Sequence, residues 1–236
     1  MASYSKAMGI ARSVRDILRF SVRTSRATQY IALVACATIL TMLLPTTPAW
    51  ALLNPLLISR QVDFSDISPF TKWTPLMPRY EAQRAEIKGR CVGKACMNQQ
   101  WETLLRRLAN KPLPEKIEAV NRFFNAIAYV SDEDNFGIND YWQTPYEMMA
   151  NGGDCEDYAI AKYISLKRLG VPETAMRIVV VKDMNLDGSV HAMLEVKFKN
   201  KAYLLDNQAK AVLPLARVFH YEPIFAINES KWWSYK

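Results

Sequence analysis

One cysteine in this chain has neighbours that suit a nucleophile. Residues 154–157 read Asp-Cys-Glu-Asp. Asp154 is a good helix N-cap and Asp157 can complete a capping-box-like arrangement, which places Cys155 at the first helical position. The helix dipole and the unpaired backbone N–H groups there stabilise a thiolate, so we expect the pKa of Cys155 to fall below its free value of about 8.5. An inert core cysteine is the alternative, but three adjacent carboxylates argue against it.

The chain has two histidines that could serve this thiol as a base. His191 begins one expected strand, and Asp206 ends the next. Facing ends of adjacent antiparallel strands would bring the Asp206 carboxylate to the His191 ring and orient the ring toward a thiol. We therefore expect a catalytic series of Cys155, His191 and Asp206. His220 lies in an aromatic stretch, and we interpret it as structural.

Two helix starts flank a glycine loop just before the cysteine. The nucleophile helix is expected over 155–168, with a broad apolar face and with Gly170 as its terminating glycine. Upstream, residues 144–147 read Thr-Pro-Tyr-Glu, the pattern of an N-cap, a first-turn proline and a capping-box glutamate. Residues 151–153 read Asn-Gly-Gly, a loop that allows close backbone approach.

Helical periodicity before the cysteine and extended segments after it indicate an α+β fold. Residues 52–73 show little periodicity and are expected to be loop-like. Helices are expected from about 77 to 111 and again after Pro114. The expected strands are 177–182, 191–198 and 202–205, the last two joined as a hairpin by a turn at Asn200-Lys201.

The basic charge of the chain comes from its amino-terminal leader. The net charge is +7, but the first 51 residues hold six Lys/Arg against one acid, which leaves 24 basic and 22 acidic residues beyond them. This balance gives no support for nucleic-acid binding. The leader has a basic start, an apolar stretch at 30–44 and a small-residue exit at 49–51, which is typical of a signal peptide. An uncleaved amino-terminal membrane anchor is the alternative, and either predicts export.

We expect one domain, 52–236, after the leader. It would comprise a helical amino-terminal part, about 74–130, and a catalytic core, about 131–215. Cys36 lies in the leader, and Cys91 and Cys96 form the remaining pair. In an oxidising compartment this spacing readily closes a small disulfide loop, with two free thiols as the alternative.

Oxygen-bearing side chains gather between the helical part and the cysteine. The run 131–142 contains Asp132, Asn139 and Asp140, and its default interpretation is a solvated loop. Its closeness in sequence to residues 154–157 makes a calcium site plausible, because calcium prefers several oxygen ligands. Residues 183–188 resemble the start of an EF-hand loop, but the twelfth position is Leu194, so we interpret them as a polar turn.

The chain contains, in this order, the motifs NDYWQTP, GDCEDYAIAKY, RLGVP, a lone strand-start histidine and LLDNQ. Through these motifs it resembles the bacterial transglutaminase-like cysteine proteinases, and among them the LapG-type periplasmic proteases. The resemblance implies a papain-like/transglutaminase-like α+β fold in which a helical layer, with the nucleophile helix, packs on an antiparallel sheet. It implies Cys155 as nucleophile, His191 as general base and then acid, and Asp206 as the orienting acid.

The resemblance also implies calcium as cofactor, with Asp154, Glu156 and Asp157 as ligands and contributions from Asn139 and Asp140. The substrate class it implies is the amino-terminal region of a large surface adhesin, cut near paired alanines to release the adhesin and disperse biofilm. An inner-membrane cyclic-di-GMP receptor would sequester the protease.

Two further residues are candidates for the cleft. Trp142 matches the family position and could line it. The oxyanion would be held by the Cys155 backbone N–H, with Gln143 as a candidate second donor. The rival hypotheses are a transglutaminase or amidase that acts on the cell wall, and a non-catalytic calcium-binding partner of a membrane receptor.

Overall fold

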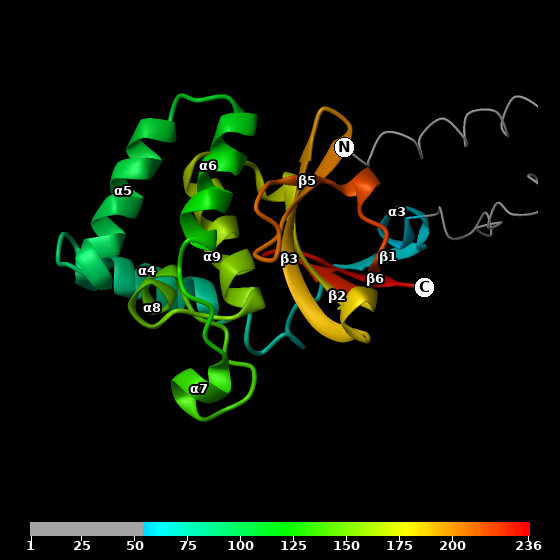
Figure 1. The fold of residues 1–236 in the computed structure, drawn as a ribbon, viewed down its shortest axis with the longest axis horizontal. Coiled ribbons are helices and arrows are strands. Elements are labelled where there is room, and N and C mark those ends of the chain that lie inside the picture. Colours follow the sequence, from blue (N-terminus) through cyan, green and yellow to red (C-terminus); the bar gives the residue numbers. More distant parts are fainter. Residues whose placement is uncertain (1–53) are drawn as a thin grey trace, which may run out of the picture. The chain divides into compact units, whose positions relative to one another are not determined.

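Helices and an antiparallel sheet form two layers in residues 54–236, the part of the chain that the structure describes (Figure 1). The structure is a computed structural model. The expected signal peptide or anchor, 1–51, lies outside the described residues, and so does Cys36. Within 54–236, none of the helices combines the length and the apolar character needed to cross a membrane. The predicted domain boundaries stay predictions.

The helical layer comes almost entirely from the chain before residue 170. The region expected to be helical from 77 to 111 contains two long helices, because a disulfide loop with the short turn η2 (Lys94–Cys96) separates them. The acidic run after Ser131 begins with a short helix and not with a loop, since the Ser131 side chain caps it by accepting from the Asp134 N–H. The helices of this layer are α4 (Leu76–Ile87), α5 (Met97–Leu108), α6 (Leu113–Asn125), α7 (Asp132–Phe136), α8 (Pro145–Asn151) and α9 (Cys155–Arg168). The short helix α3 (Pro55–Ile58) packs on the other face of the sheet (Figure 1).

Strands form one seven-stranded antiparallel sheet in the order β1-β7-β6-β2-β3-β4-β5. The three expected strands are present as β2, β3 and β4, which confirms the α+β class. The strands are β1 (Gln61–Phe64), β2 (Met176–Asp183), β3 (Ser189–Phe198), β4 (Lys201–Leu205), β5 (Leu213–Pro214), β6 (Tyr221–Ile227) and β7 (Trp232–Tyr235). Short 3-10 turns η3 (Glu173–Ala175), η4 (Met184–Leu186) and η5 (Leu215–Arg217) connect some of them.

The β3–β4 hairpin turns one residue earlier than the sequence suggested. Phe198 pairs with Lys201, so the turn residues are Lys199 and Asn200. Both have positive φ, 48° and 59°. A two-residue loop with both residues in this region matches the right-handed twist of the flanking strands, which explains why the expected Asn200-Lys201 turn was displaced.

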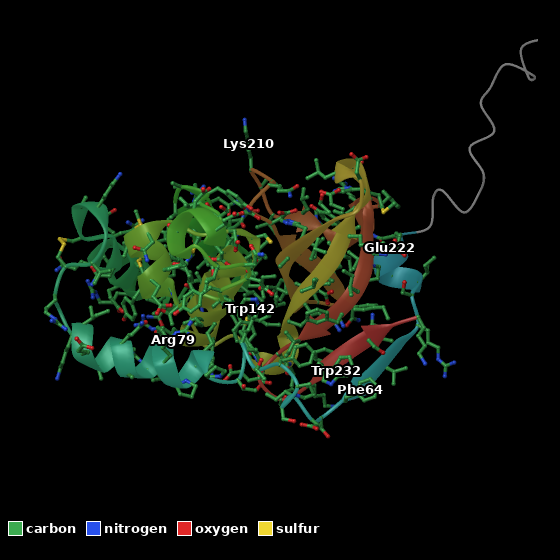
Figure 2. The ribbon with its side chains drawn as sticks, turned by 90° about the horizontal axis from the view of Figure 1, so that it is seen from below. Phe64, Arg79, Trp142, Lys210, Glu222 and Trp232 are labelled. Carbon is green, nitrogen blue, oxygen red and sulfur yellow. A yellow bond between two sulfur atoms is a disulfide. The ribbon has the colours of Figure 1, made fainter. Side chains whose placement is uncertain are left out.

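The expectation that residues 52–73 are loop-like was wrong in part. They contain α3 and the edge strand β1, which pairs with β7. The rings of Phe64 on β1 and Trp232 on β7 stack with centroids 4.4 Å apart (Figure 2). A four-residue edge strand has almost no periodicity of its own, so its partner across the sheet defines it.

Helix α9 lies at the centre of the core. It packs against α6 on one side and against β2 and β3 on another, and every residue from Glu156 to Leu166 is buried. A helix that is buried on all faces needs apolar or paired side chains all round, and this explains its lack of a polar stripe. Gly170 follows its end with φ +80°, as the sequence predicted.

A disulfide between Cys91 and Cys96 closes the loop that joins α4 to α5, which confirms the expected pairing. Gly93 in this loop has φ +73°, and a Cβ built there would lie 2.2 Å from the backbone oxygen of Met149 on α8. The loop therefore packs directly on the helix that leads to the cysteine. A disulfide of this kind fits an oxidising, extracytoplasmic compartment.

Replacing Cys91 and Cys96 together by serine is expected to lower the free energy of unfolding by about 2 kcal/mol, because a cross-link over a loop of this length removes about that much chain entropy from the unfolded state. Urea unfolding of the oxidised protein and the variant measures the difference. Reduced wild type should match the variant. Equal urea midpoints for the oxidised wild type, the reduced wild type and the variant would contradict the prediction. The packing of the loop on α8 would then be what holds it in place.

Candidate active site

Cys155 is the first residue of α9, as the sequence predicted. Asp154 and Asp157 form the expected capping box. The Asp154 side chain accepts from the Asp157 backbone N–H, and the Asp157 side chain accepts from the Asp154 backbone N–H. The cysteine is partly buried, and it is the free cysteine of the described residues. Its thiol donates to Glu156 Oε2 at 3.2 Å, and the Ala192 backbone N–H points toward the sulfur. The nucleophile candidate thus faces the start of β3.

The expected lowering of the cysteine pKa is not found in this arrangement. Burial raises the pKa of Cys155, and the charges of Glu156 and then Asp154 raise it further. The helix end contributes about half a positive charge. Whenever Glu156 and Asp154 are ionised, their charges oppose it, one in direct contact with the sulfur and the other next to it. The helix dipole can be read from the sequence, whereas the burial of these acids depends on the tertiary structure.

His191 and Asp206 meet as predicted. His191 Nε2 lies 2.9 Å from Asp206 Oδ1, and both side chains are almost fully buried. The other ring nitrogen, Nδ1, lies 3.4 Å from Gln208 Nε2. Because Nε2 is bound to Asp206, Nδ1 is the ring nitrogen that can exchange a proton with another partner. Ala192, whose backbone N–H points toward the Cys155 sulfur, directly follows His191 on β3, so this strand brings the backbone of the two candidates near each other.

Asp206 is held by more donors than the sequence indicated. The Tyr221 hydroxyl donates to Oδ2 at 2.6 Å and the Gln208 backbone N–H donates to Oδ1 at 2.9 Å. Burial raises the pKa of Asp206, but the hydrogen bonds and charge of His191 and the bond from Tyr221 outweigh it, and the net pKa is lowered. Tyr221 was missed because β6 is distant in sequence and was not expected. His220 packs on Tyr221, with ring centroids 4.1 Å apart.

Three carboxylates converge beside the cysteine. Asp132, Asp154 and Asp157 each offer an oxygen, and these oxygens lie within 4.8 Å of one another. Oδ1 of Asp132 and Oδ1 of Asp154 are buried and have no hydrogen-bond partner within the described chain. Unpaired buried carboxylate oxygens are costly, and a cation with oxygen ligands would satisfy them. The donor set therefore fits a calcium ion. Asp132 belongs to the oxygen-rich run noted in the sequence, but it was not among the ligands that the family resemblance implied.

Glu156 and Asp157 share this environment. Burial raises the pKa of Glu156 to about 9, and the adjacent Asp154 charge adds to the effect. Burial likewise raises the pKa of Asp157 to about 8. Carboxyl groups that are this hard to ionise lack a nearby positive charge, since an opposite charge would favour the ionised form. A divalent cation at the cluster would supply it.

Gln143 holds the cysteine loop together. Its side-chain NH₂ donates to the Gly152 carbonyl at 3.0 Å and to Asp157 Oδ2 at 2.6 Å, and its backbone N–H donates to Asp157 Oδ1 at 2.7 Å. Both side-chain hydrogens are thereby used. In this arrangement the side chain links the loop to the helix start and has no free donor for an oxyanion.

The remaining site candidates lie on the approach to α8. Asn139 is exposed, and Asp140 forms an ion pair with Lys72. Asp140 also accepts from the indole N–H of Trp142 at 2.8 Å. Trp142 is buried, with its ring against Trp73, so it packs in the core. Its backbone carbonyl accepts from the Arg79 side chain on α4 (Figure 2).

A cysteine at the first residue of a buried helix, with a histidine on one strand and an aspartate directly after the adjacent antiparallel strand, is the arrangement of the transglutaminase-like cysteine-proteinase class. Residues 89–234, more than half of the chain, match the family described as bacterial transglutaminase-like cysteine proteinase BTLCP. The chain belongs to this family.

Solved structures of Legionella pneumophila LapG are similar to this chain. The calcium-bound form is 28% identical, with a TM-score of 0.56, and the match covers 66% of this chain and 86% of that one. The EGTA-treated form is 31% identical, with a TM-score of 0.54 and 59% and 76% coverage. No curated protein matches the chain. The family model and these structures agree on the class.

Tyr221→Phe is expected to raise the pKa of Asp206, because it removes a hydrogen bond to the ionised carboxylate. Stability gained from a lowered carboxyl pKa is present at neutral pH and lost as pH falls through the native pKa. The variant should lose about 1.5–3 kcal/mol at neutral pH and less in acid. Urea unfolding at several pH values measures this. The control is Tyr235→Phe, since the buried Tyr235 hydroxyl has no hydrogen-bond partner in the described chain. Equal losses in both variants would contradict the assignment.

Proposed function

We propose that this protein is a calcium-dependent cysteine endopeptidase of the periplasm. The observation that carries the proposal is the buried His191–Asp206 pair, 2.9 Å apart, in a fold whose buried helix α9 begins with a cysteine. A thiol, a base and an orienting acid in this arrangement suit acyl transfer through a thioester. The family to which the chain belongs carries out chemistry of the same class.

In the proposed reaction, the Cys155 sulfur attacks the scissile carbonyl carbon, and its proton passes to His191 Nδ1. His191 then protonates the leaving amine, which departs and leaves a thioester on Cys155. A water molecule, deprotonated by His191, attacks the thioester and releases the acid product. Asp206 keeps the ring oriented through Nε2. The Cys155 backbone N–H at the helix start is the proposed donor to the oxyanion.

Calcium would be held by Asp154, Glu156 and Asp157 together with Asp132. The unpaired Oδ1 atoms of Asp132 and Asp154 support this set. The bound ion would supply positive charge that neutralises the carboxylates and fixes the geometry of the loop. Asn139 and Asp140 stay predicted contributors from the exposed side. The relative crystallised with calcium, Legionella LapG, supports the choice of cation.

The proposed substrate is the amino-terminal region of a large surface adhesin, cut near paired alanines so that the adhesin is released and biofilm disperses. The proposed regulator is an inner-membrane cyclic-di-GMP receptor that sequesters the enzyme. Both rest on the resemblance to LapG-type proteases, supported by the similarity to Legionella LapG. The disulfide supports export to an oxidising compartment.

The purified protein is expected to cleave the amino-terminal region of the same organism's adhesin, whereas Cys155→Ala should lose at least about 10³-fold in rate because no nucleophile remains. Gel analysis and mass spectrometry of the fragments measure this. A primary amine is added in a parallel reaction. Crosslinked product would indicate a transferase, and a Cys155→Ala protein that keeps its biological effect would indicate a non-catalytic binding partner.

Asp132→Asn and Asp154→Asn are each expected to weaken calcium binding by roughly tenfold or more, because each removes a charged ligand. Isothermal titration calorimetry measures the affinity, and EGTA should abolish cleavage until calcium is restored. Glu133→Gln is the matched control, since Glu133 is an exposed acid on α7 beside Asp132. Asp140→Asn tests the predicted contribution of Asp140. Unchanged affinity in both cluster variants would refute the ligand set.

A further inference from the structure

A lysine is buried in the middle of the nucleophile helix. Lys162 on α9 is 0% exposed, whereas lysines are almost never buried without a charged partner in direct contact. Its Nζ donates to the Leu205 carbonyl at 3.3 Å and lies 5.7 Å from the centroid of the Tyr158 ring. The mechanism above does not use it. Burying an ammonium group costs free energy, and a single backbone carbonyl compensates it only in part.

The contact places Lys162 directly behind the candidate triad. Leu205 is the last residue of β4, and Asp206 follows it. Both oxygens of the Asp206 carboxylate already accept hydrogen bonds, from His191, Gln208 and Tyr221. Any effect of Lys162 on Asp206 would therefore pass through the adjacent backbone carbonyl and through the field of its charge. From α6, Asn125 donates to the Asp206 carbonyl at 2.8 Å and holds the same segment from another side.

The charges around Lys162 are few. Burial lowers the pKa of Lys162 to about 7, and the negative charge of Asp206 opposes this shift. Tyr158 is the titratable group that faces it from α9, and Asn125 of α6 is uncharged. His191 and Tyr221 lie beyond Asp206. The ammonium form is thus present below a pH of about 7 and is lost above it.

We propose that Lys162 is a positioning residue for the triad: its ammonium group ties α9 to the end of β4 and holds the Asp206 carboxylate in place against His191. The proposal deepens the proposed function and rests on it. The same helix then carries the nucleophile at its first residue and, two turns later, the cation that supports the acid. Burying the ammonium group lowers the stability of the fold, whereas the position that it gives Asp206 favours catalysis.

The test compares Lys162→Met with a matched variant, Lys116→Met. Methionine nearly preserves the length of the side chain and removes its charge. Lys116 on α6 also donates from Nζ to a backbone carbonyl, that of Leu169 at 2.8 Å, but at the opposite end of α9. The measurements, all with calcium present, are kcat and KM for adhesin cleavage, the rate of Cys155 alkylation by iodoacetamide, and the melting temperature, each across a pH range of about 5.5 to 9.

At a pH of about 6, Lys162→Met should lose about tenfold in kcat with little change in KM, and Cys155 alkylation should slow in parallel. The deficit should shrink as pH rises through about 7, because the wild-type lysine loses its charge there. The variant should also melt higher than wild type at the lower pH, since no ammonium is buried. Lys116→Met should show no pH-dependent loss of activity.

A full kcat at the lower pH would overturn the proposal. So would a deficit of equal size at every pH, or a lower melting temperature, because each indicates a merely structural lysine. Alkylation keeps this test separate from the protease assignment. If wild type cleaves no protein while Cys155 alkylation still depends on Lys162 and pH as described, the proposed function fails and the positioning role stands.

Discussion

The buried carboxylate of Asp157 is the constraint on which the site depends. It is fully buried and accepts from the Gln143 backbone, the Gln143 side chain and the Asp154 backbone N–H. These bonds fix the start of α9 to the segment before α8 and to the glycine loop. Gly153 fits only because it lacks a Cβ, which would lie 2.5 Å from Asp157 Oδ2. These contacts set the orientation of Cys155 at the start of α9.

Charge is distributed unevenly along α9. Its first turn buries Glu156 and Asp157 beside Asp154, and negative charge on Glu156 or Asp154 opposes a thiolate at Cys155. A calcium ion would relieve this opposition, which gives a physical reason why activity would depend on the ion. Farther along the helix, Lys162 supplies a positive charge behind Asp206. The helix therefore combines an acidic first turn with a buried lysine two turns farther along.

Short-range sequence patterns were sufficient to predict much of the secondary structure of the catalytic region. The capping boxes, the first-position cysteine and the β2, β3 and β4 segments follow from short-range pattern, and the structure confirms them. The His191–Asp206 contact also followed, because a hairpin brings its strand ends together. Short-range pattern did not predict strand β1 or the position of the β3–β4 turn. A short edge strand and a one-residue turn shift depend on pairing partners and backbone twist, which local composition encodes weakly.

The sequence by itself determined the class of protein and the identity of the candidate triad, since residue type, spacing and capping are local properties. Only the tertiary structure decided the protonation environment. The raised pKa of Cys155, the approach of Asp132 to the acidic cluster, and the burial of Tyr221 and Lys162 around Asp206 all arise between segments far apart in the chain. Burial and through-space charge set these properties, and both depend on which segments meet when the sheet and helices pack.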